Sequence, residues 1–415
     1  MRSWFAAYAA ETHADPTMKL TLRDSLGMCP AHTRRLLDEG IAASWLATAL
    51  FADISRTGAR LLRSGGAPPG GRCPPCVASG RRASGMLHLV RTGLDESEHV
   101  RDAYTAGPGA CVAHTRQLLA GASARVAALV IDVLGARLSA ATTEALVGVD
   151  ADSDRRDQSW SENHDAVLAA EERAAKLSTA AYVDMMLETP ACPLCTARVR
   201  STWRYLGWLA GITKPAELRQ DAVLCPTHLT DLATVGGEDV AARFAAYNAD
   251  RTADDLSRAA DRLGRLPGTF AGRVAHLVSD RAVRDALVPA FRGAPCRTCH
   301  FADQAEGSAL RLARITAADP ARSGDLAEAH GLCLRHALRL SGRGELDAAW
   351  HALATTRLRL LSYDLDTAIQ HAGWDSRWQV HGAEMGAWHH AADLLDGEVL
   401  GPRAAQPDEP PRGAW

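Results

Sequence analysis

Long uncharged apolar runs are missing from this chain of 415 residues, and both lysine and aromatic residues are scarce. No stretch of about 18 apolar residues occurs, which excludes an obvious transmembrane helix. The first sixteen residues lack the apolar core of a signal peptide. We therefore expect a soluble, cytoplasmic protein with no membrane partner.

Strong net charge is also missing, because the formal net charge is −3. The arginines are spread along the chain without a sustained basic run, which argues against nucleic acid as a partner. Strings of the H-E-x-x-H, P-loop and G-x-G-x-x-G types are absent as well. The sequence thus indicates no enzyme class, and we lean against an enzyme.

The pattern of apolar residues is helical. Leucine, isoleucine and tryptophan recur with a period near 3.6 residues over 37–61, 118–134 and 358–369. Alternating β-branched runs are scarce, and aromatic residues make up only 5% of the chain, so few strands are expected. The prediction is an all-α fold.

Ten cysteines form seven short motifs, with none left over. In a reducing cytoplasm such cysteines bind metal or do redox chemistry rather than form structural disulfides. Three motifs are Cys-x-x-Cys and four are Cys-x-x-His. The Cys-x-x-Cys motifs are Cys73/Cys76, Cys192/Cys195 and Cys296/Cys299, and the Cys-x-x-His motifs are Cys29/His32, Cys111/His114, Cys225/His228 and Cys333/His336.

Spacing suggests how the motifs pair. From each Cys-x-x-Cys to the next Cys-x-x-His the gaps are 34, 29 and 33 residues. From each Cys-x-x-His to the next Cys-x-x-Cys they are 40, 77 and 67 residues. A constant insert suits one structural unit, so we predict that each Cys-x-x-Cys pairs with the Cys-x-x-His that follows it.

Each predicted quartet offers three thiolates and one imidazole. Positions i and i+3 share a helix face, so one turn can present both ligands to a single ion. Three sulfurs and one nitrogen complete a closed tetrahedral zinc site, which predicts about three zinc ions per chain. An iron–sulfur cluster with one histidine ligand, or thiol redox chemistry, is the alternative. Cys296 to His300 also spells a c-type haem string, which we interpret as incidental because the other two Cys-x-x-Cys motifs are followed by Val77 and Thr196.

The paired motifs predict tandem helical repeats, each with one zinc knuckle. Breaks rich in glycine, proline or charge separate them at 64–72, 149–158 and 266–268. The predicted segments are 1–63 (a truncated first repeat and a long helix), 67–148, 160–266, 267–400 (the fourth repeat with C-terminal helices) and a disordered tail at 401–415.

Cys29 and His32 have no Cys-x-x-Cys before them. We expect that the true start lies upstream of Met1 and supplies one. As an alternative, the same two residues of a second chain complete the site, which gives a homodimer.

The motifs resemble a bacterial domain family of unknown function that carries CPxC, an aromatic-containing helix and then GxCxxH. Cys192-Pro193-Leu194-Cys195 matches the first half, and the second half is matched where Gly27, Gly109 and Gly331 stand two residues before a cysteine. The resemblance implies a helical fold and metal ligation, and no activity. Two positions depart from the pattern: Arg297 replaces the proline and Val223 replaces the glycine. We expect a non-catalytic zinc scaffold that binds an unidentified protein or small ligand.

Overall fold

The computed structural model describes residues 2–38, 44–149, 179–188, 191–212, 223–264, 296–372 and 382–397. Within these ranges the regular elements are helices and no strand occurs, so the all-α prediction is confirmed. None of the described helices is long and apolar enough to cross a membrane. The predicted tail 401–415 and the break at 266–268 lie outside the described residues.

Two compact units divide the chain, and each is assembled from segments that are distant in sequence. Unit 1 comprises Met1–Ser79, Glu172–Trp203 and Ala302–Trp415, and unit 2 comprises Gly80–Glu171 and Arg204–Phe301. This division cuts across the consecutive segments expected from the sequence. Three helices, α5 (Pro74–Glu96), α11 (Pro193–Ala210) and α15 (Arg297–Ala318), contribute residues to both units.

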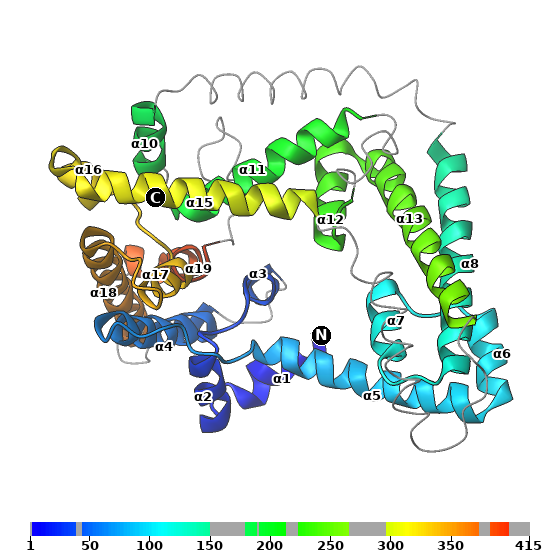
Figure 1. The fold of residues 1–415 in the computed structure, drawn as a ribbon. Coiled ribbons are helices and arrows are strands. Elements are labelled where there is room, and N and C mark those ends of the chain that lie inside the picture. The colour runs from blue at the N-terminus through cyan, green and yellow to red at the C-terminus, as the bar shows by residue number, and fades with distance from the viewer. Residues whose placement is uncertain are drawn as a thin grey trace. The chain divides into compact units, whose positions relative to one another are not determined.

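Unit 1 is built on two long helices, α4 and α18, that pack together (Figure 1). Apolar side chains such as Phe51 of α4 and Leu358 of α18 are buried in one continuous core. Ser55 and Ser362 join the two helices by a hydrogen bond of 2.8 Å between their hydroxyls. The elements belonging wholly to unit 1 are α1 (Arg2–Ala7), a π-helical turn (Tyr8–Thr12), α2 (Pro16–Asp24), α3 (Pro30–Asp38), α4 (Ser44–Arg63), α10 (Thr179–Glu188), α16 (Ser323–Glu328), α17 (Leu334–Ser341), α18 (Ala348–His371), α19 (Ala387–Asp396) and 3-10 turns at Pro320–Arg322 and Ala383–Gly386.

Of the two core stripes predicted in unit 1, the one at 358–369 holds for most of its length, and the one at 37–61 holds only at Leu50 and Ile54. Leu361 and Leu365 are buried, as a core-facing helix requires. The stripes fail at their ends, because Trp45 is 48% exposed and Ile369 is 39% exposed. Trp45 lies in the first turn of α4, and Ile369 lies in the last turn of α18.

Unit 2 pairs the helices α8 and α13 side by side. Val130 of α8 and Leu256 of α13 are fully buried in the same cluster. A second cluster forms around Leu206 and Phe244, where the end of α11 meets α12 and α13. The elements belonging wholly to unit 2 are α6 (Glu98–Ala106), α7 (Val112–Leu119), α8 (Ala124–Val149), α12 (Pro226–Gly236) and α13 (Glu238–Gly264).

Candidate metal centres

Six of the seven motifs come together as three groups of potential metal ligands. Each group joins one Cys-x-x-Cys to one Cys-x-x-His, and its ligand atoms all lie within 4.8 Å of one another. We name them the N-terminal site (Cys29, His32, Cys73, Cys76), the buried site (Cys192, Cys195, Cys333, His336) and the nested site (Cys225, His228, Cys296, Cys299). The first two belong to unit 1 and the third to unit 2.

The predicted pairing of motifs is wrong in all three cases. The constant-insert rule joined Cys76 to Cys111, Cys195 to Cys225 and Cys299 to Cys333, and the structure places none of these pairs in one group. The rejected rule succeeds for the N-terminal and nested sites and fails for Cys192/Cys195, which pairs with Cys333/His336 instead. The cost of closing a loop grows only slowly with its length, so helix packing, not a uniform spacing, decides the partner.

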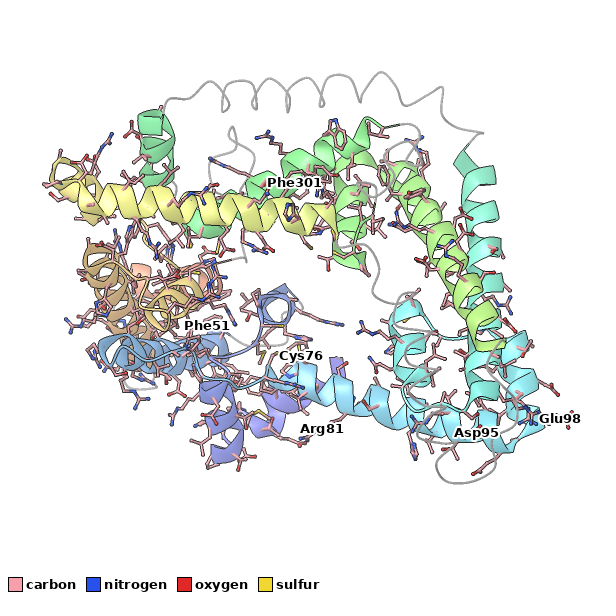
Figure 2. All side chains as sticks on the ribbon, viewed as in Figure 1. Phe51, Cys76, Arg81, Asp95, Glu98 and Phe301 are labelled. Carbon is pink, nitrogen blue, oxygen red and sulfur yellow. The ribbon has the colours of Figure 1, made fainter. Side chains whose placement is uncertain are left out.

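The N-terminal site also corrects the expectation about Met1. Cys29 and His32 obtain two thiols from Cys73 and Cys76, so their group contains four ligands from residues 29–76. The need for an upstream Cys-x-x-Cys and the proposal of a shared site at Cys29 both lose their basis. Cys76 stands in the first turn of α5 (Figure 2).

Each Cys-x-x-His motif is a preformed helix start. Cys111, Cys225 and Cys333 are the N-caps of their helices, with φ from −74° to −63° and ψ from 157° to 162°. Because the histidine follows three residues later, Nδ1 lies against the cysteine sulfur, at 3.1 Å in Cys29/His32 and 3.2 Å in Cys333/His336. The glycine two residues before the cysteine has a positive φ in three motifs, where a side chain would be strained.

Each Cys-x-x-Cys motif also opens a helix, as its sequence predicts. Pro74 and Pro193 are the first residues of α5 and α11, where a missing N–H does no harm. Arg297 occupies this position in α15 and donates its backbone N–H to the carbonyl of Val223 at 3.4 Å. A proline has no N–H for this bond. The two residues that depart from the motif pattern, Arg297 and Val223, are therefore hydrogen-bonded to each other beside the nested site.

The distances within the groups fit one tetrahedral ion. Zinc–sulfur bonds of about 2.3 Å at tetrahedral angles place two sulfurs about 3.8 Å apart. The Sγ–Sγ distances are 3.8 Å for Cys29–Cys76, 3.8 Å for Cys195–Cys333 and 4.0 Å for Cys225–Cys299. A disulfide requires about 2.05 Å, so these sulfurs are not bonded.

The electrostatics of each group favour one thiolate, because the pKa of one thiol is lowered while the pKa of at least one neighbouring thiol is raised. Contact with Cys73, together with the backbone N–H and ring of His32, lowers the pKa of Cys29 to about 4. Contact with Cys225, followed by His228, lowers the pKa of Cys296 to about 3. Thiolate is the form that binds a metal cation, and its negative charge in a cluster of thiols calls for a positive counter-charge.

The buried site lies in the main hydrophobic core of unit 1. Cys192, Cys195 and Cys333 are each at most 2% exposed. Gly397, just after α19, closes over them with φ +68°, and a Cβ at this residue would stand 2.5 Å from Cys195 Sγ. Only a glycine fits there, so the backbone itself excludes water from the sulfurs.

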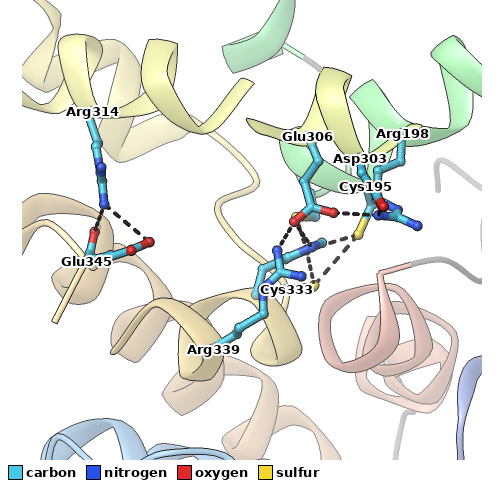
Figure 3. A network of polar contacts seen from close by, with 10 residues as sticks. Cys195, Arg198, Asp303, Glu306, Arg314, Cys333, Arg339 and Glu345 are labelled. Atoms are coloured by element: carbon cyan, nitrogen blue, oxygen red, sulfur yellow. Dashed lines mark hydrogen bonds and ion pairs between the residues drawn. The ribbon is translucent and has the colours of Figure 1, made fainter. Parts of the chain in front are cut away.

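A polar network centred on the carboxylate of Glu306 lies next to Cys195 and Cys333 of the buried site (Figure 3). His336 directs Nδ1 toward the sulfurs, while its Nε2 lies 3.6 Å from Oε1 of Glu306. Glu306 also accepts a hydrogen bond of 2.7 Å from Arg198 and forms an ion pair with Arg339. Carboxylates behind metal-binding histidines fix the tautomer and ring orientation, which matches this arrangement.

Cys111 and His114 join none of the three groups. Their Sγ and Nδ1 are 3.4 Å apart, and both residues are exposed at the start of α7. Among the described residues, no third cysteine, histidine or carboxylate completes a group with them.

A shallow pocket of about 490 Å³ in unit 1 is lined mainly by arginines of α2, α4 and α18. Arg23, Arg60 and Arg63 lie in the last turns of their helices, where positive charge is favoured by the helix dipole. Arg23 also donates to Asp53 at 2.7 Å, and Arg56 pairs with a carboxylate of α18. Helix electrostatics and internal pairs account for these arginines without a ligand.

The fold and the three groups define a helical protein with Cys3His centres able to hold metal ions. No family model, no curated protein and no solved structure matches this chain.

Sequence reasoning found the ligands of the groups and missed what surrounds them. Glu306 is one of many charged residues on α15, and nothing in its local pattern points to a histidine 30 positions later. Gly397 precedes a polar tail and carries no motif. The signal for both is spatial, because only the fold brings them to the buried site.

Proposed function

We propose that the chain is a zinc-binding helical scaffold, in which three Cys3His sites hold together segments that are distant in sequence. The observation that carries this proposal is the convergence of three sulfurs and one Nδ1, all within 4.8 Å, in each of the three groups. Four protein ligands fill the coordination of a tetrahedral zinc ion and leave no position for a reactive water. This supports a structural role over a hydrolytic one.

An iron–sulfur cluster is the second candidate for the same groups. A cluster distributes its protein ligands over several irons, whereas sulfur separations of 3.8–4.0 Å suit ligands that share one ion. Redox chemistry by free thiols is further disfavoured at the buried site, where the sulfurs are enclosed by the core. These distances favour zinc.

The biological role that we propose follows from closed sites and from the lack of catalytic motifs. A scaffold of this kind binds another protein or a small ligand in the cytoplasm. The GxCxxH and CPxC matches further support membership of the bacterial domain family of unknown function that the sequence resembles.

Metal analysis combined with an optical spectrum tests the proposal. Protein purified without added metal should contain at least three zinc ions per chain and show no visible absorption. Iron in comparable amount, together with strong visible absorption, would show that the groups hold iron–sulfur clusters and not zinc. Protein that is folded and contains neither metal would refute the metal sites altogether.

A further inference from the structure

The motif Cys111/His114 is built like the three motifs that belong to metal groups. Its cysteine is an N-cap with φ −64° and ψ 161°, close to the −63° and 157° of Cys333. Its Sγ–Nδ1 distance of 3.4 Å is near the 3.2 Å of Cys225/His228. Gly109, two residues earlier, has a positive φ of 67°, and the glycines before Cys29 and Cys333 also have positive φ, at 87° and 89°. Two ligand atoms are therefore already oriented toward one point.

The surroundings of this motif differ from those of the other three. The four residues of the motif, from Cys111 to His114, are all exposed, and Val112 is 38% exposed. Its two missing ligands are not found within the described residues of the chain. The motif is thus an accessible half-site next to an exposed apolar side chain.

We propose that Cys111 and His114 form half of a fourth zinc site, which a second copy of this chain completes with the same two residues. The choice of zinc rests on the proposed function. Two copies related by a twofold axis contribute two sulfurs and two nitrogens, which is a complete Cys2His2 tetrahedron. Two thiolates neutralise the charge of Zn²⁺, and the same rotation brings the two Val112 side chains next to the shared ion, where association covers them.

The proposal fixes a stoichiometry that no arrangement within one chain produces. Three closed sites per chain and one site shared between two chains give seven zinc ions per dimer, or 3.5 per chain. The metal-loaded, full-length protein is measured by light scattering and by zinc analysis of the same sample. We expect a dimer with 3.5 zinc ions per chain.

Variants separate this site from the others. Cys111→Ser and His114→Ala should each give a monomer with three zinc ions and an unchanged helical circular dichroism spectrum. Arg116→Ala, an exposed change on the same helix, should remain a dimer with 3.5. Both substituted ligands are exposed, so the helix should fold without them.

Several results would overturn the proposal. A wild-type monomer with three zinc ions leaves the half-site unused, and a monomer with four means that the chain completes the site itself. A dimer that survives Cys111→Ser forms through another surface. If the Cys111→Ser protein lacks zinc altogether, the three closed sites fail as well, and the error lies in the proposed function.

Discussion

Replacing Glu306 by glutamine tests whether the buried site depends on its carboxylate network. The side chain of Glu306 is only 12% exposed and contacts Arg198, Arg339 and His336. Glu306→Gln keeps the volume but removes the negative charge between two guanidinium groups. The amide then presents N–H groups to at least one cationic donor, which leaves that donor without an acceptor.

The structure sets the size of the effect. A hydrogen bond to a charged group contributes about 1.5–3 kcal/mol, and breaking a buried pair can cost about 3–5 kcal/mol. Arg198 keeps a second partner, Asp303, at 2.6 Å, so the loss falls mainly on Arg339 and His336. We expect a decrease of about 2–3 kcal/mol in the free energy of unfolding. Zinc affinity at the buried site should fall about tenfold to hundredfold, as is typical when a partner of a metal-binding histidine is lost.

The assay is zinc release to a chromogenic chelator, combined with urea unfolding. In Glu306→Gln one zinc ion should leave faster than in wild type, while the others leave at unchanged rates. Asp303→Asn is the matched control, because Asp303 contacts the same Arg198 but its side chain is 69% exposed. It should change stability by less than about 1 kcal/mol. Equal effects of the two variants, or no change in release, would refute the role of Glu306.

Three further predictions concern the buried site and its surroundings. Gly397→Ala should remove one zinc ion, because its Cβ would stand 2.5 Å from Cys195 Sγ. Gly344→Ala, at a residue with a similar φ of +66° and open space around it, should leave the zinc content unchanged. Equal metal content of the two variants would contradict the steric argument. Cys195→Ser and Cys333→Ser should each remove one zinc ion and together remove no more than one, which metal analysis of the double variant decides. Burial raises the pKa of Asp393 to about 6, so between about pH 4 and 6 the folded chain holds a proton there that the unfolded chain has released. The free energy of unfolding therefore decreases as the pH rises through this range. Asp393→Asn should therefore increase the free energy of unfolding at pH 7 by up to about 3 kcal/mol, seen as a higher melting temperature, and have little effect below pH 4. The same gain at both pH values would exclude the linkage.

Local structure could be predicted from the sequence because its causes are local. The helix starts at Pro74 and Pro193 follow from proline's fixed φ, and the contact of each histidine with its cysteine follows from i, i+3 geometry. Apolar periodicity likewise located the long helices of unit 1. These features need no knowledge of which helix packs against which.

The pairing of motifs could not be predicted in this way. Cys195 and Cys333 are separated by 138 positions and yet meet in the core. Their meeting depends on how α11, α15, α17 and α19 bury their apolar faces together, and the spacing of cysteines contains no information about that packing. The regular gaps of about 30 residues reflect how often helices begin, not which helices share an ion.

The order of the three sites along the chain has a physical consequence for folding. The nested site joins residues 225–299 and lies wholly between the two halves of the buried site, at 192–195 and 333–336. Once the nested site has bound its ion, the chain between Cys195 and Cys333 is effectively shortened, because 225 and 299 are held together. Loop-closure entropy then opposes the buried site less than its sequence separation suggests. The gain is reciprocal, because the combined loop entropy of the two closed sites does not depend on the order in which they form. Loop length sets the order instead, since the loop of the nested site is the shorter one and closes at the lower entropic cost. Metal binding at the nested site, whose four ligands are only partly buried, should therefore precede closure of the water-excluded site, whose sulfurs become inaccessible once Gly397 is in place.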